Sequence, residues 1–134
     1  LTVRQNILLP AIIGGSVSQT VEDRADKLCQ VFGISGISNK YPAEISGGEK
    51  QRTAVARALI NQPLMILADE PTGNLDARNA WEIMKLLEEI NQRGTTVLVV
   101  THNLEIVKAM KKRVITMKKG VVVSDERMGD GDEN

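Results

Sequence analysis

Residues 45–76 form the segment that most constrains the fold of this chain, ISGGEKQRTAVARALINQPLMILADEPTGNLD. The segment opens with a Ser-Gly-Gly turn at Ser46, continues with helical spacing and reaches a short apolar run, LMILA, at residues 64–68. An apolar run this short, with no alternating polar residues, is typical of a strand buried on both faces of a parallel sheet. Two acids follow at once, Asp69 and Glu70, so the pattern places them at the carboxyl edge of that sheet.

The remaining sequence alternates between helical and strand-like patterns. Helices are predicted, the first of them as a helix or a turn, over residues 1–13, 20–32, 48–61, 77–92 and 104–110. A second strand is predicted over residues 95–101, and a hairpin pairs residues 114–117 with 121–124. Thr20 is the predicted N-cap of its helix. Strands that alternate with helices favour an α/β fold with a parallel sheet.

The order of these elements predicts three regions. Residues 1–62 lack a clear strand and are expected to be a helical subdomain that ends with the helix after the Ser-Gly-Gly turn. Residues 63–124 are expected to be the C-terminal part of an α/β core. Residues 125–134 hold five acids and two glycines, which predicts a disordered acidic tail.

Composition excludes several classes of function. Seventeen basic residues balance seventeen acidic ones, which gives no electrostatic case for binding nucleic acid. No apolar run approaches the roughly 18–20 residues of a membrane span, so direct membrane insertion is not expected. The lone Cys29 excludes an internal disulfide and fits a reducing cytoplasm. The chain opens on Leu1, which suggests a piece of a longer protein.

Asp69 and Glu70 are the first candidates for chemistry. Ligands bind beyond the carboxyl ends of strands in an open α/β sheet, and Mg²⁺ prefers oxygen ligands. Asp69 is therefore placed to hold Mg²⁺, and Glu70 to act as a general base that polarises water for attack on a γ-phosphate. The simpler alternative is that Asp69 caps a helix and Glu70 is solvated.

The Ser-Gly-Gly turn is a candidate anion site. Gly47 and Gly48 allow close approach of the backbone, the following helix presents unpaired N–H groups, and Ser46 adds a hydroxyl. A terminal phosphate suits this set, although an ordinary loop-to-helix turn with a serine cap would have the same sequence.

Four further positions are considered. His102 follows the strand at residues 95–101 and could contact a γ-phosphate, or could be a plain polar residue at a strand end. Asp76 could bond across a subunit boundary, cap the helix that begins at Ala77, or do both. Gln51 and Arg52 could face solvent or brace their helix.

These motifs together resemble those of ATP-binding cassette (ABC) transporter ATPases. ISGGE at residues 45–49 resembles the signature motif LSGGQ, LMILADE at 64–70 the Walker B strand with its catalytic glutamate, GNLD at 73–76 the D-loop, and His102 the switch histidine. The resemblance covers nearly the whole chain. It is strongest to the group of lipoprotein-release, macrolide-export and FtsE-like cell-division ATPases.

The resemblance implies a P-loop NTPase-like parallel sheet with a helical subdomain. It also implies ATP and Mg²⁺ as cofactors, with Glu70 and His102 catalytic, Asp69 at the metal, and nucleotide contacts from Ser46, Gly47, Gly48, Glu49 and Asp76. Two departures stand out. Glu49 replaces a glutamine, which is tolerable if its carboxylate points away from phosphate or bonds a donor. No G-x-x-x-x-G-K-S/T sequence occurs in the chain, so the N-terminal phosphate-loop part is missing.

For an intact parent protein, the resemblance implies a homodimer closed head-to-tail around Mg-ATP. It also implies an integral-membrane permease partner whose coupling segment docks near residues 1–32, and a cytoplasmic position on the inner face of the membrane. Two alternatives remain open. The chain could be a non-catalytic truncated or engineered fragment. It could also be an ABC-type DNA-repair or chromosome ATPase, which the short stretch before Ser46 and the balanced charge disfavour.

Overall fold

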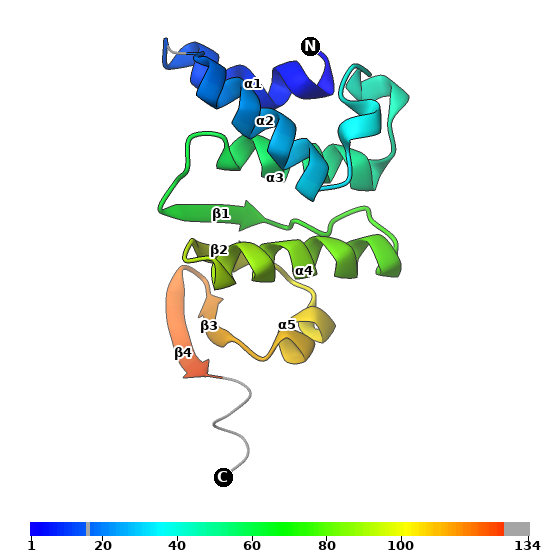
Figure 1. The fold of residues 1–134 in the computed structure, drawn as a ribbon. Helices are drawn as coiled ribbons and strands as arrows, with labels where there is room; N and C mark the ends of the chain where they lie inside the picture. Colours follow the sequence, from blue (N-terminus) through cyan, green and yellow to red (C-terminus); the bar gives the residue numbers. More distant parts are fainter. Residues whose placement is uncertain (16, 128–134) are drawn as a thin grey trace. The chain divides into compact units, whose positions relative to one another are not determined.

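The computed structural model describes residues 1–15 and 17–127 and divides the chain into two compact units. The first unit spans Leu1–Val100, and the second begins at Thr101. Figure 1 shows the order of the elements along the chain. The first unit contains the predicted helical region together with the first two strands, and the division expected between residues 62 and 63 stays a prediction.

The first unit begins with helices α1 (Val3–Ile13), α2 (Gln19–Val31) and α3 (Gly47–Leu59). Short 3₁₀ turns, η1 (Ser35–Ile37) and η2 (Pro42–Glu44), connect α2 to α3. The three helices contact one another and bury an aliphatic core. Its least accessible members are Val3, Ile7, Ala25, Ile34, Ala56 and Ile60.

The predicted N-cap of α2 is wrong by two residues. Ser18 has the extended backbone of an N-cap, and its hydroxyl accepts a hydrogen bond from the N–H of Val21 at 3.3 Å. Thr20 lies inside the first turn instead. Serine and threonine are both good caps, so the residue types alone could not choose between these two positions.

A parallel pair of strands, β1 (Met65–Asp69) and β2 (Thr96–Val100), follows the helices in the first unit. The register pairs Leu67 with Leu98 and Asp69 with Val100. Helix α4 (Ala77–Gln92) connects the strands and buries one apolar side that includes Ile83 and Leu87. The predicted α/β class with a parallel sheet is therefore confirmed, and Asp69 ends β1 at the carboxyl edge.

The expectation that β1 is buried on both faces is wrong within the described residues. Ile66 is buried, but Met65 and Leu67 are 50% and 68% exposed, and Leu98 and Val100 on β2 are 48% and 53% exposed. These four side chains share one face of the sheet, because residues two apart point the same way and the register aligns both strands. In the part of the chain described, only the opposite face is covered.

The second unit contains helix α5 (Leu104–Met110) and a hairpin of strands β3 (Arg113–Lys118) and β4 (Val121–Arg127). The predicted hairpin is confirmed, and its tight turn places Lys119 and Gly120 at positive φ angles of 51° and 77°. Residues 125–127 belong to β4 and not to a tail, because Asp125 forms an ion pair with Arg113 at 2.7 Å on the paired strand. The rest of the predicted tail, residues 128–134, lies outside the described residues.

Candidate functional site

The carboxyl end of β1 presents the two predicted acids. Asp69 is the last residue of the strand and is exposed. The N–H of Glu70 donates to the carbonyl oxygen of Val100 at 2.7 Å, which ties Glu70 to the end of β2. Glu70 also has a φ of 47°, in the left-handed region that non-glycine residues rarely adopt. Such strain persists only where the surrounding structure imposes it, and it is common at functional sites. We call Asp69 and Glu70 the acidic edge.

A tight loop joins the acidic edge to α4. The N–H of Gly73 donates to the Glu70 carbonyl at 3.1 Å, and the N–H of Leu75 donates to the Thr72 carbonyl at 3.2 Å. Asp76 then caps α4 by accepting a hydrogen bond from the N–H of Asn79 at 2.8 Å. The capping alternative for Asp76 is thus confirmed. Its role across a subunit boundary stays a prediction.

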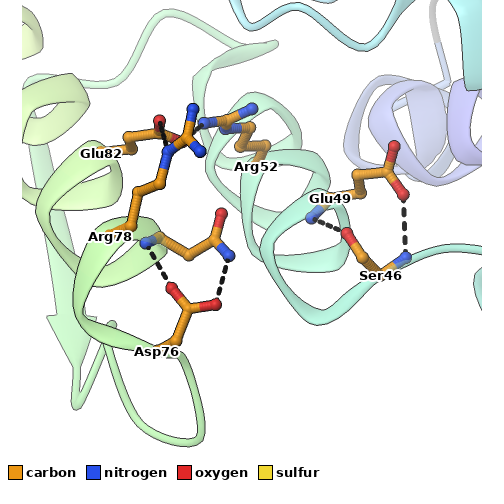
Figure 2. A network of polar contacts seen from close by, with 7 residues as sticks. Ser46, Glu49, Arg52, Asp76, Arg78 and Glu82 are labelled. Carbon is orange, nitrogen blue, oxygen red and sulfur yellow. Dashed lines mark hydrogen bonds and ion pairs between the residues drawn. The ribbon is translucent and has the colours of Figure 1, made fainter.

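Residues 46–49, which we call the serine–glycine turn, form a reciprocal capping box at the start of α3. The hydroxyl oxygen of Ser46 accepts from the N–H of Glu49 at 3.1 Å, and Glu49 Oε1 accepts from the N–H of Ser46 at 2.8 Å (Figure 2). The Ser46 N–H donor, more than any other group, lowers the pKa of the Glu49 carboxyl. The carboxylate that replaces the family's glutamine therefore bonds a donor, which is a condition under which it is tolerable near an anion.

The serine–glycine turn lies directly against the beginning of α4. A Cβ atom added to Gly47 would meet Leu75 Cδ2 at 3.4 Å, and one added to Gly48 would meet Asn79 Oδ1 at 2.9 Å. The second distance is too short for real Cβ atoms. The structure thus brings the serine–glycine turn and the loop that ends at Asp76 into contact, although they are far apart in sequence.

Gln51 and Arg52, for which the sequence left two readings open, both brace α3. Gln51 Nε2 donates to the carbonyl oxygen of Pro71 at 2.8 Å. Arg52 Nη2 donates to Glu82 Oε2 on α4, and Arg78 approaches the other oxygen of Glu82 at 3.6 Å (Figure 2). Sequence reasoning missed Glu82 and Asn79. Asn79 had a weak signal, three residues after a capping aspartate, whereas nothing in the sequence marked Glu82.

His102 belongs to the second unit, where it lies between Thr101 and Asn103 in the irregular segment before α5. The N–H of Asn103 donates to the Thr101 hydroxyl at 3.0 Å. In sequence, His102 comes two residues after the end of β2. Its predicted role at the γ-phosphate stays a prediction.

The donor set suits a metal that is only partly held by protein. Among residues 1–15 and 17–127, no group of three or more His, Cys, Asp or Glu side chains is arranged to hold an ion. Mg²⁺ usually keeps several waters and needs one or two carboxylates besides substrate phosphates. The exposed carboxylate of Asp69 at the sheet edge fits that pattern.

Comparison with known proteins matches this chain to one protein family and to two kinds of ATP-binding protein. The ABC transporter family model matches residues 1–73. The cell division ATP-binding protein FtsE of Bacillus subtilis (strain 168) is 44% identical over 130 residues, which cover 97% of this chain and 57% of that protein. The macrolide export ATP-binding/permease protein MacB of Chlorobium luteolum is 46% identical over 127 residues, 95% of this chain and 19% of that protein.

The solved structures that are similar to this chain are also ATP-binding cassettes. A dimeric ATP-binding cassette in a post-hydrolysis state bound to ADP and Pi matches with a TM-score of 0.79 and 38% identity, over 95% of this chain and 56% of that one. A nucleotide-free cassette from an ABC transporter matches with a TM-score of 0.88 at 23% identity, which supports the fold alone. The chain belongs to the ABC transporter family. It spans a little over half the length of the FtsE relatives.

Proposed function

We propose that this chain is part of the ATP-binding and ATP-hydrolysing subunit of an ABC transporter or an FtsEX-like complex. The observation that carries the proposal is the placement of the acidic edge. Asp69 ends a parallel strand, and Glu70 follows in a strained conformation bonded to the neighbouring strand. The serine–glycine turn, capped and packed against the loop before α4, supplies the second half of such a site.

The residues divide the chemistry between them. Asp69 would hold Mg²⁺, which would supply positive charge beside the phosphates, and Glu70 accepts a proton from the attacking water. His102 contacts the γ-phosphate and orients that water. Ser46 and the N–H groups of Gly47 and Gly48 bind the terminal phosphate of a nucleotide held by the partner copy, since a helix N-terminus favours anions. Glu49 shapes the turn and Asp76 contacts the partner.

In this scheme two copies close head-to-tail around Mg-ATP, and closure moves the helices of the first unit. A permease subunit in the membrane receives that motion, so the protein lies on the cytoplasmic side of the membrane. The FtsE and MacB relatives are named as ATP-binding proteins, which supports ATP binding, and the dimeric cassettes among the solved structures support the dimer. No helix among the described residues has the length and apolar character needed to span a bilayer.

The test is Glu70→Gln in the longest natural form of the protein that carries this chain. Removing the proton acceptor while keeping the shape is expected to abolish steady-state ATP turnover and to leave ATP-dependent dimers intact, measured by phosphate release and by size-exclusion chromatography. Glu89→Gln, an exposed position on α4, is the matched control and is expected to leave turnover unchanged. Normal turnover by Glu70→Gln would remove the role assigned to Glu70.

A second reading concerns the 134-residue chain by itself. Because its sequence contains no phosphate loop, we propose that the isolated chain is not an ATPase. Titration with ATP, followed by calorimetry, is expected to show no binding in the micromolar range. Micromolar affinity would contradict this reading.

A further inference from the structure

Asn79 holds the carboxylate of Asp76 from two directions. Its backbone N–H donates to Asp76 Oδ1 at 2.8 Å, and its side-chain Nδ2 donates to Asp76 Oδ2 at 3.0 Å. The backbone bond alone would fix one oxygen, as in an ordinary N-cap. The amide bond fixes the second oxygen as well, so the rotation of the carboxylate is set by the side chain of Asn79.

The other end of the same amide faces the serine–glycine turn. A Cβ atom on Gly48 would lie 2.9 Å from Asn79 Oδ1 and 3.2 Å from Asn79 Cγ. Gly48 is buried, and its φ lies outside the left-handed region that favours glycine. The need for glycine at this position therefore comes from the close approach of Asn79 and not from the backbone conformation.

We propose that Asn79 is a positioning residue that links Asp76 to Gly48 and so fixes the spacing between the Asp76 loop and the serine–glycine turn. The inference deepens the proposed function and rests on it. In that function, the Asp76 loop contacts the partner copy while the serine–glycine turn binds the partner's nucleotide. If the spacing loosens, one part engages without the other, and the closed dimer forms in a less productive geometry. Two contacts lie nearby: Leu75 packs next to Gly47 of the turn, and Gln51, two residues beyond the turn on α3, bonds Pro71.

Three substitutions separate the two contacts of the amide. Asn79→Leu keeps its branched shape but removes the donor. Asn79→Ser keeps a shorter side-chain donor but removes most of the volume next to Gly48. Asn79→Ala removes both.

The first measurement is the titration of the Asp76 carboxyl by carbon NMR in the full 134-residue chain. The Asn79 donors, backbone first and side chain second, hold the pKa of Asp76 below its ordinary value of 3.8. Asn79→Leu and Asn79→Ala are expected to raise the pKa of Asp76, and Asn79→Ser to preserve most of the difference. An unchanged pKa in Asn79→Leu would overturn the link to Asp76.

The second measurement is the melting temperature of Gly48→Ala, made in the wild-type chain and in each of the three Asn79 variants. Gly48→Ala alone is expected to lower the melting temperature or to prevent folding, because its methyl group meets the Asn79 amide. Adding Asn79→Ala or Asn79→Ser is expected to restore folding, whereas adding Asn79→Leu is not, so the effects are non-additive. Additive losses, or double variants that all fail to fold, would overturn the contact with Gly48.

The third measurement is ATP turnover in the longest natural form of the protein. Asn79→Leu is expected to lower kcat by roughly tenfold to a hundredfold with little change in KM, as expected of misplaced groups, and Asn79→Ser to retain most of the turnover. Wild-type kcat in Asn79→Leu would overturn the functional part. If the unmodified protein does not hydrolyse ATP, the proposed function fails, while the first two measurements still decide the role of Asn79.

Discussion

Glu49 shows how one residue can keep a turn intact while changing its charge. Its carboxylate and the Ser46 hydroxyl each accept a hydrogen bond from the other's backbone N–H. A glutamine could accept the same bond through its side-chain oxygen, so the capping box explains why either residue is compatible with the turn. The carboxylate differs in that its stabilising contribution depends on pH.

The expected pH dependence follows from the direction of the pKa shift. The pKa of Glu49 lies below its ordinary value of 4.5 in the folded chain, so its contribution is present above that value and is lost as pH falls through the folded pKa. Chemical unfolding is measured from pH 7 downward. Below about pH 4.5, the wild type is expected to lose more of its free energy of unfolding than Glu49→Gln does. The pKa values of Asp76 and Asp125 are also lowered. Because both proteins contain these residues, their contributions cancel in the difference between the two pH profiles. Parallel pH profiles would contradict the capping role of the charge.

Ser46 carries the part of this capping box that does not depend on pH. Ser46→Ala removes the acceptor for the Glu49 N–H and is expected to lower the free energy of unfolding by about 1 kcal/mol. Ser38→Ala is the control in the same urea unfolding experiment, because the Ser38 side chain caps no helix in the described part of the chain. An equal loss in both variants would contradict the cap.

At the scale of elements, helix α4 was predicted with both of its ends correct, as was α5. Its bounds, Ala77–Gln92, agree with the prediction because a capping aspartate precedes it, an apolar side runs along it and Gly94 follows its end. Its buried side includes Ile83, which is fully inaccessible to solvent. The helix therefore anchors β2 and the α3 side of the first unit through the core.

A core substitution in α4 tests that anchoring role. Ile83→Ala is expected to lower the free energy of unfolding by roughly 2–5 kcal/mol, because it removes buried methyl groups and leaves a cavity. Lys85→Ala, on the exposed side of the same helix, is expected to change it by less than about 0.5 kcal/mol. Urea unfolding followed by circular dichroism measures both. A small effect of Ile83→Ala would mean that α4 does not hold the core.

Strand β1 shows where pattern reasoning fails at this scale. Its apolar run predicted burial on two faces, since parallel strands are normally covered on both. The sequence pattern correctly predicted a strand, and its side chains are apolar on both faces. Whether both faces are covered depends on which other segments pack there, and the described residues cover only one.

At the scale of the whole molecule, the apolar face of the β1–β2 pair is a group of exposed hydrophobic side chains among the described residues. Leu67 and Leu98 lie opposite each other on neighbouring strands and are both about half exposed or more. Contiguous exposed apolar side chains bind apolar dyes, whereas isolated ones do so weakly.

Dye binding tests that description. Leu67→Thr is expected to lower the fluorescence of bound ANS clearly, since threonine suits a strand but is polar at this face. Leu104→Thr is the matched control, because Leu104 is also 68% exposed but lies on α5 in the second unit. Equal decreases in the two variants would contradict a continuous apolar face on the sheet.

Local sequence patterns were sufficient to predict the helices and strands, the parallel sheet and the position of Asp69 at the end of a strand. These features follow from local periodicity, caps and turn residues, which act over a few neighbours. The sequence also predicted the serine–glycine turn as a helix start, which the capping box of Ser46 confirms.

The side chains that connect these elements became known from the packing of the folded chain. The contacts of Gly48 with Asn79, of Gln51 with Pro71 and of Arg52 with Glu82 join residues about 20 to 31 positions apart. The same tertiary packing left one sheet face exposed and placed His102 in a separate compact unit. Local patterns cannot specify such pairings, because they depend on how close two helices approach and on which face each presents.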